Sequence, residues 1–154
     1  MRVLLVNTSD SAGGAAIAAR RLLTALNNHG VQATMLVRDK QTENLRIKSL
    51  PPSPLLRAKF VMERAEIFAA NSFSRENLFA VDHATHGYDI TRLPEFEQAD
   101  VIHLHWVNQG MLSLSDIRKV LASGKRVVWT LHDMWPCTGI CHQSAGCEEW
   151  LRAC

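Results

Sequence analysis

The chain has 154 residues, of which 47% are hydrophobic and 21% charged, and its formal net charge is +2. This length and composition are ordinary for one globular domain with its own core. Basic and acidic residues nearly balance and form no basic run, so nucleic acid is not an expected partner. The N-terminal apolar run is too short for a signal peptide and no long apolar span follows, so we expect a cytoplasmic protein.

The first quarter of the chain alternates strand and helix patterns. Residues 2–7, RVLLVN, are typical of a strand that is buried on both faces. Residues 8–30 begin with a glycine-rich turn, continue with apolar residues at helical spacing and end at the stop signal Gly30. Residues 31–38 form a second strand pattern, and this order predicts two parallel strands joined by a right-handed crossover.

The middle of the chain has weaker patterns. Residues 44–50 suggest a short third strand, and residues 55–73 form an amphipathic helix pattern after a proline-rich break. Two interpretations of this helix stay open: it covers the sheet, or it lies on an anionic lipid surface through its Arg and Lys residues. Residues 74–91 show little periodicity and are predicted to be mostly loop.

The last third returns to alternating elements. The pattern predicts, in order, a short helix at 93–99, a strand at 100–107, a helix at 113–124 with Ser113 or Ser115 as N-cap and Gly124 as terminator, and a buried-type strand at 125–132. We therefore predict one α/β domain over residues 1–154. Its expected fold is Rossmann-like: an open parallel sheet with helices on both faces.

Ligands of such sheets bind at the carboxyl ends of the strands, where the first turn carries Gly13 and Gly14. The turn leads into a helix, whose unpaired N–H groups and dipole favour an anion such as phosphate. The dinucleotide pattern G-x-G-x-x-G and the P-loop Lys are both absent. A tight turn that binds no ligand is therefore the alternative.

Two later strands bring histidines to the same edge. His103 and His105 alternate along their strand and share one face, and His105 is nearer the ligand edge. His132 and Asp133 follow the last strand, where His can hydrogen-bond a hydroxylated ligand and Asp can orient it or cap a turn. Trp135 either stacks on a sugar or closes the core.

The cysteines all lie in the last eighteen residues, which suggests a local loop feature rather than a disulfide framework. Four thiolates, or three with His142, would satisfy tetrahedral Zn²⁺, although the usual C-x2-C pair is missing. A structural zinc loop and free thiols are the two alternatives for this set: Cys137, Cys141, Cys147 and Cys154.

Three stretches carry a resemblance to a known family: MRVLLVNTSDSAGGAAIAARRLLTAL, DVIHLHWVNQGMLS and GKRVVWTLHDMWPCTGICH. Together they resemble the amino-terminal domain of glycosyltransferase family 4, the retaining enzymes with two Rossmann domains (GT-B fold), and in particular bacterial polysaccharide-assembly members. Residues 40–95 resemble the family poorly, as expected of an acceptor-specific region. Cys137 stands where the family pattern has Phe.

The resemblance implies roles for individual residues. Gly13 and Gly14 correspond to a loop that lies against the donor diphosphate or the acceptor, and His132 and Asp133 correspond to residues at the donor sugar. The substrates would be a nucleotide sugar and a polysaccharide or lipid-linked glycan, with no required cofactor. The family's second, nucleotide-holding domain is expected to lie beyond residue 154, so we expect these residues alone to be inactive.

A second hypothesis is a non-catalytic Rossmann-like module. Such a domain would bind an anionic ligand or a partner protein without turnover, and an exposed sheet edge would favour a homo-oligomer. Peripheral contact with the inner membrane surface is compatible with either hypothesis.

Overall fold

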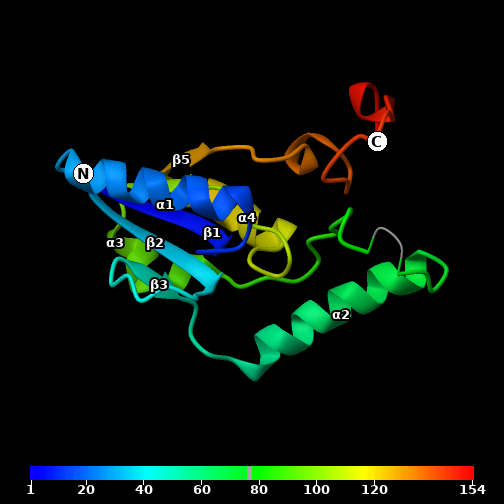
Figure 1. Cartoon of the computed structure of the whole chain (residues 1–154), viewed down its shortest axis with the longest axis horizontal. Helices are drawn as coiled ribbons and strands as arrows, with labels where there is room; N and C mark the ends of the chain where they lie inside the picture. Colours follow the sequence, from blue (N-terminus) through cyan, green and yellow to red (C-terminus); the bar gives the residue numbers. More distant parts are fainter. Residues whose placement is uncertain (76–77) are drawn as a thin grey trace.

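The computed structural model describes residues 1–75 and 78–154 of the chain. These residues contain one parallel sheet with the strand order β3-β2-β1-β4-β5, shown in Figure 1. The central strand β1 pairs with β2 and β4, so that Leu4 lies beside Thr34 on one side and Ile102 on the other. The strands are β1 (Arg2–Ser9), β2 (Gln32–Asp39), β3 (Ile47–Ser49), β4 (Val101–Leu104) and β5 (Arg126–Trp129).

Helices lie on both faces of this sheet, which confirms the predicted Rossmann-like class. On one face, Ala19 and Leu23 of α1 pack in a core with Leu5 and Met35. On the other, the core includes apolar side chains of α3 and α4. The helical segments are α1 (Gly13–Asn28), α2 (Pro54–Ala70), η1 (Ile90–Arg92), α3 (Pro94–Gln98), α4 (Leu114–Ala122), η2 (Trp135–Cys137) and η3 (Glu149–Leu151).

Strand β1 shows why the sheet forms where it does. Its apolar residues alternate between the two cores, with Val3 and Leu5 facing α1 and with Leu4 and Val6 facing the opposite core. Burial of each such side chain contributes roughly 1.5–3 kcal/mol. A strand that is apolar on both faces therefore belongs in the middle of a sheet covered by helices.

The helix signals read from the sequence are confirmed in detail at α4. Ser113, rather than Ser115, is the N-cap, and its hydroxyl accepts the backbone N–H of Asp116 at 3.1 Å. The Asp116 carboxylate accepts the backbone N–H of Ser113 in return, which completes a capping box. Beyond the helix, Gly124 has a φ of +76°, as expected of a glycine terminator.

Strand β5 differs from its prediction as a buried strand. It pairs with β4 alone and is the last strand in the sheet order, and Val128 is 49% exposed. An apolar run of this kind indicates burial on both faces, but in the described residues only one face of β5 is packed. Val127 and Trp129 pack against the core that includes α4, whereas Val128 points to the open face. The strand is therefore half-exposed.

Helix α2 does not cover the sheet, so that interpretation of residues 55–73 was wrong. Figure 1 shows α2 apart from the strands, beside the loop that follows it. Its buried side chains Glu63 and Arg64 contact this loop, at Thr85 and Asp82 respectively. Within the described residues, no helix has the length and apolar character needed to span a bilayer.

The segment at 74–91 is mostly loop, as predicted. Two of its residues, 76–77, lie outside the described residues. The rest contains an isolated bridge from Val81 to Cys141 and the start of η1. This bridge joins the middle of the chain to its cysteine-containing end.

Candidate functional site

The glycine-rich turn lies at the carboxyl end of β1. No side chain caps α1, and the nearby Ser9 hydroxyl instead accepts the backbone N–H groups of Ser11 and Ala12 at 3.2 and 3.1 Å. Gly13 has a φ of +82°, and a Cβ added to Gly13 or Gly14 would meet no atom within 4 Å. The start of α1 is thus open to a ligand, and its N-terminal dipole favours an anion.

Asp10 connects this turn to the segment after β2, a role that the sequence patterns did not reveal. The carboxylate is fully buried and accepts the backbone N–H of Gln41 at 2.8 Å and that of Thr42 at 2.9 Å. Burial alone would raise the pKa of Asp10, but the hydrogen bonds from Thr42 and Gln41 outweigh it and the pKa is lowered. Asp10 is therefore a buried anion that holds two loops of the edge together.

Three histidines stack at the ends of β4 and β5. The rings of His103 and His105 are 4.4 Å apart, which confirms that the two share one face, and the ring of His132 lies 5.2 Å from that of His105. His105 Nδ1 is 2.9 Å from His132 Nε2, and His103 Nε2 is 2.8 Å from the Thr130 hydroxyl. The prediction that His105 and His132 lie at one edge is thus confirmed by direct contact.

Burial keeps this histidine group neutral. It lowers the pKa of His105 to about 3, with repulsion from His103 and His132 as smaller causes. Burial also lowers the pKa values of His103 and His132. At neutral pH the rings are therefore uncharged hydrogen-bonding groups that suit sugar hydroxyls better than phosphate. His132 and His103 are both partly exposed, whereas His105 is only 4% exposed.

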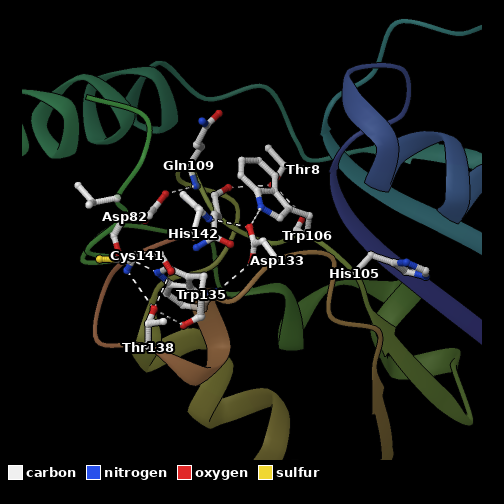
Figure 2. Close-up of polar contacts among 12 residues, drawn as sticks. Thr8, Asp82, His105, Trp106, Gln109, Asp133, Trp135, Thr138, Cys141 and His142 are labelled. Atoms are coloured by element: carbon white, nitrogen blue, oxygen red, sulfur yellow. Dashed lines mark hydrogen bonds and ion pairs between the residues drawn. The ribbon is translucent and has the colours of Figure 1, made fainter. Parts of the chain in front are cut away.

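Asp133 uses its carboxylate to hold neighbouring side chains (Figure 2). Its Oδ2 accepts the indole N–H of Trp106 at 2.7 Å and lies 2.7 Å from His142 Nδ1. Its Oδ1 accepts the backbone N–H of Trp135 at 3.1 Å. Both oxygens are thus engaged, and Figure 2 shows His105 turned away from this group. The geometry favours a positioning role for Asp133.

Trp135 is 6% exposed and packs in the core. Its indole N–H donates to the backbone carbonyl of Asp82 at 2.8 Å, so its polar atom is already satisfied. This burial favours the core alternative over sugar stacking. Trp106 is less buried and lies over His142, with the ring centroids 5.5 Å apart.

Asp82 anchors the loop beneath Trp135, and sequence patterns missed it because it lies in a segment without periodicity. Its carboxylate is fully buried and accepts the backbone N–H groups of Gln109 at 2.7 Å and Ala84 at 2.8 Å. Arg64 of α2 reaches the same carboxylate at 3.3 Å. One side chain thus joins α2, its following loop and the segment after β4.

A second buried carboxylate, Glu63, lies beside this pair. Glu63 Oε2 is 3.9 Å from Arg64 Nη2, and Glu63 Oε1 accepts the backbone N–H of Thr85 at 3.1 Å. Burial and repulsion from Asp82 raise the pKa of Glu63 to about 7, against a weaker opposing effect of Arg64. Two carboxyl groups therefore share one guanidinium.

The predicted zinc loop has no assembled ligand set. All four cysteines are free thiols, with Cys141 partly buried and the other three exposed. In residues 1–75 and 78–154, no group of three or more His, Cys, Asp or Glu side chains is arranged to hold a metal ion. Zinc binding by Cys137, Cys141, Cys147 and Cys154 stays a prediction.

The fold and its edge define a Rossmann-like domain that offers an uncapped helix and neutral imidazoles to a ligand. Residues 12–152 match glycosyltransferase family 4, and the chain belongs to this family. Over 60 residues it is 35% identical to a putative colanic acid biosynthesis glycosyl transferase, WcaC, of Escherichia coli (strain K12). That match covers 35% of this chain and only 15% of the relative. No solved structure matches the chain significantly.

Proposed function

We propose that the chain is the acceptor-side domain of a retaining glycosyltransferase of the GT-B type. The reaction would move a hexose from a nucleotide sugar to a growing polysaccharide or lipid-linked glycan. The family match over residues 12–152 carries this proposal. The resemblance to a protein named for colanic acid biosynthesis supports a polysaccharide product. We place the reaction in the cytoplasm, at the inner membrane surface if the acceptor is lipid-linked.

The residues of the edge suit the two tasks of such a transfer. The leaving diphosphate needs positive charge, which the open start of α1 at Gly13 and Gly14 supplies through backbone N–H groups. The sugar needs hydrogen bonds that fix its orientation, and the partly exposed His132 supplies one with its neutral ring. His105 holds His132 in place through the 2.9 Å contact between their rings.

Asp133 acts in this proposal through its neighbours rather than as a nucleophile. Its oxygens hold Trp106 and His142, and no covalent step is assigned to this domain. No cofactor is required, because the nucleotide sugar is a substrate. By resemblance, the nucleotide itself is held by a second domain, so residues 1–154 alone should transfer no sugar above background.

The proposal is tested with the product of the complete reading frame. Purified enzyme is incubated with a panel of nucleotide sugars and a glycolipid extract, and products are identified by mass spectrometry. One donor should give a sugar adduct, and His132→Ala should lower kcat about 100-fold or more because an orienting hydrogen bond is lost. His29→Ala, at an exposed histidine at the end of α1, is the matched control and should retain activity. Failure of every donor would refute the proposal.

One observation favours the alternative of a self-associating module. The edge strand β5 leaves one side unpaired within the described residues, and Val128 and Leu131 near it are 49% and 48% exposed. Light scattering on the purified chain measures its mass directly. A stable dimer without transferase activity in the complete product would support the module, whereas a monomer would remove its only structural support.

A further inference from the structure

A cavity of about 1120 Å³ lies on the α2 side of the sheet, away from the histidine group. Its walls come from three places: the end of β2 with the segment after it, the end of β3 with the segment after it, and the first turns of α2. The segment after β2 is tied to the glycine-rich turn, since the Ser11 hydroxyl donates to Gln41 Oε1 at 2.7 Å and Asp10 accepts from Gln41 and Thr42. The cavity is thus part of the same carboxyl edge.

The charged side chains of this cavity are mostly cationic. Arg38 is bound to Asp39 and stacks over Phe60, with its guanidinium carbon 4.7 Å from the ring centroid. In the described part of the chain, Lys40 and Arg57 form no ion pair, and Arg57 is exposed. After Arg38 and Asp39 cancel, two uncompensated positive charges line the cavity and favour an anionic group.

The backbone adds to this preference for an anion. Helix α2 has 17 residues and begins at the cavity, where its N-cap Ser53 forms no side-chain cap. Its positive dipole end therefore faces the same space as Lys40 and Arg57. The dipole alone would not define a site, but here it coincides with a cavity and two unpaired cations.

The remaining walls are apolar. Leu50, Pro51, Pro52, Phe60 and Val61 line the cavity, and Val61 is 62% exposed. Along the outer surface of α2, Leu55 and Met62 are also 60% and 53% exposed. A free phosphate would leave these surfaces in water, whereas a ligand with an apolar chain would cover them.

We propose that this cavity binds a phosphate ester whose phosphate or diphosphate group is joined to an apolar chain. Lys40 and Arg57 bind the anion, and Phe60 and Val61 contact the start of the chain. Naming this ligand as the sugar acceptor rests on the proposed function, but its binding does not.

Binding is tested by titration calorimetry of the 154-residue chain with farnesyl diphosphate and, separately, inorganic pyrophosphate. Farnesyl diphosphate should bind at least tenfold more tightly than pyrophosphate, because only the former covers the apolar wall. The double variant Lys40→Gln/Arg57→Gln should weaken both ligands about tenfold, through loss of two charge-assisted contacts. Val61→Ser should weaken farnesyl diphosphate about threefold and leave pyrophosphate unchanged.

Matched controls carry the same changes elsewhere. Arg118→Gln/Arg126→Gln removes two exposed cations, and Leu121→Ser alters an exposed leucine of α4. Equal effects of the cavity and control variants would overturn the proposal, as would equal affinity for the two ligands. Binding to phosphatidylglycerol vesicles without binding to farnesyl diphosphate would assign the surface to a membrane and also overturn it.

The transfer assay separates this inference from the proposed function. If the complete enzyme transfers sugar and the Lys40→Gln/Arg57→Gln variant retains the wild-type KM for its acceptor, the cavity assignment is wrong and the function stands. If the cavity variants weaken binding while no donor supports transfer, the cavity stands and the function falls.

Discussion

The histidine group at the ends of β4 and β5 and the ion group beside α2 are both sets of titratable side chains with buried members. In the first, His103, His105 and His132 stack without a counter-charge on His105. In the second, Glu63 and Asp82 share Arg64. Burial disfavours the charged form in both sets, so it lowers the pKa of a base and raises that of an acid.

The two regions therefore respond to pH in opposite directions. The folded histidine group is favoured when its imidazoles are neutral, so its contribution to stability is lost as pH falls. The folded state is favoured when Glu63 is protonated, so the contribution of Glu63 is lost as pH rises. The difference also fits their tasks, because neutral imidazoles can bind a sugar, whereas a carboxylate pair around one arginine fastens α2 to the loop.

The largest effect is expected at Asp82. Asp82→Ala removes the acceptor for Gln109, Ala84 and Arg64 at once, and it leaves a buried arginine beside Glu63 alone. We expect a loss of about 3–5 kcal/mol in the free energy of unfolding, measured by urea titration with tryptophan fluorescence. Asp82→Asn keeps one acceptor and should cost less.

An exposed aspartate provides the control for this change. Asp100 pairs with Arg2 at 3.5 Å, and the two side chains are 49% and 53% exposed. Because this pair is exposed to water, Asp100→Ala should cost clearly less stability than Asp82→Ala in the same titration. If the two variants lose the same stability, Asp82 is not the anchor of the α2 region.

Unlike Asp82→Ala, Glu63→Gln should raise the free energy of unfolding at alkaline pH. The pKa of Glu63 is about 7 in the folded chain against 4.5 for the free group, so the folded state binds the extra proton between these values. Stability therefore falls as pH rises from 4.5 to 7, by up to about 3 kcal/mol in all. The amide introduced by Glu63→Gln would stay neutral at every pH, and its carbonyl oxygen could still accept the backbone N–H of Thr85.

The measurement is a set of urea titrations at pH 5 and pH 8. We expect Glu63→Gln to be more stable than wild type at pH 8 and nearly equal at pH 5. Glu66→Gln, at an exposed position of the same helix, should leave the pH dependence unchanged. A destabilised Glu63→Gln chain at pH 8 would show that the charged carboxylate is favoured by Arg64 after all.

Local signals predicted much of the fold because they depend on neighbours in sequence. The apolar run of β1 predicted a buried strand, and Ser113 with Gly124 predicted the ends of α4. Strand β5 has a similar apolar run but lies at an edge, and no local signal reports which strands lie beside it. Its exposure could not be read from its composition.

The candidate site was predicted in part for the same reason. The ends of parallel strands meet at one edge, so the proximity of His105 and His132 followed from the strand order. Asp10 and Asp82 were missed because their partners lie about 30 residues away, at Thr42 and Gln109. Such pairings depend on how loops close, which no periodicity encodes.

Replacing His105 should reduce the loss of folding stability that the chain shows as pH falls. The pKa of His105 is about 3 in the folded chain and 6.5 for the free group, so the unfolded chain binds the extra proton between these values. The contribution of neutral His105 is fully present above pH 6.5 and is lost as pH falls through that window. Wild type should lose about 1–2 kcal/mol between pH 6.5 and 5, and His105→Gln should lose less. His29→Gln, at an exposed position, should behave as wild type.

Among the variants proposed, the smallest loss of folding stability is expected at Lys119, whose charged and paired side chain is exposed. Its ammonium lies 2.8 Å from Asp89 and 3.6 Å from Asp116, and the lysine side chain is 51% exposed. The hydrogen bond from Lys119 is the main reason why the pKa of Asp89 is lowered to about 2. This contribution is present above pH 3.8 and is lost only as pH falls toward 2. Because water screens the pair, Lys119→Gln should cost the least stability of these variants at pH 7, although it removes the contacts with both Asp89 and Asp116. The buried pair of Asp82 with Arg64 is longer, at 3.3 Å, than the exposed pair of Lys119 with Asp89, at 2.8 Å. Distance alone would therefore predict the larger loss at Lys119. If Lys119→Gln costs as much as Asp82→Ala in the same urea titration, burial is not what separates strong from weak ion pairs in this chain.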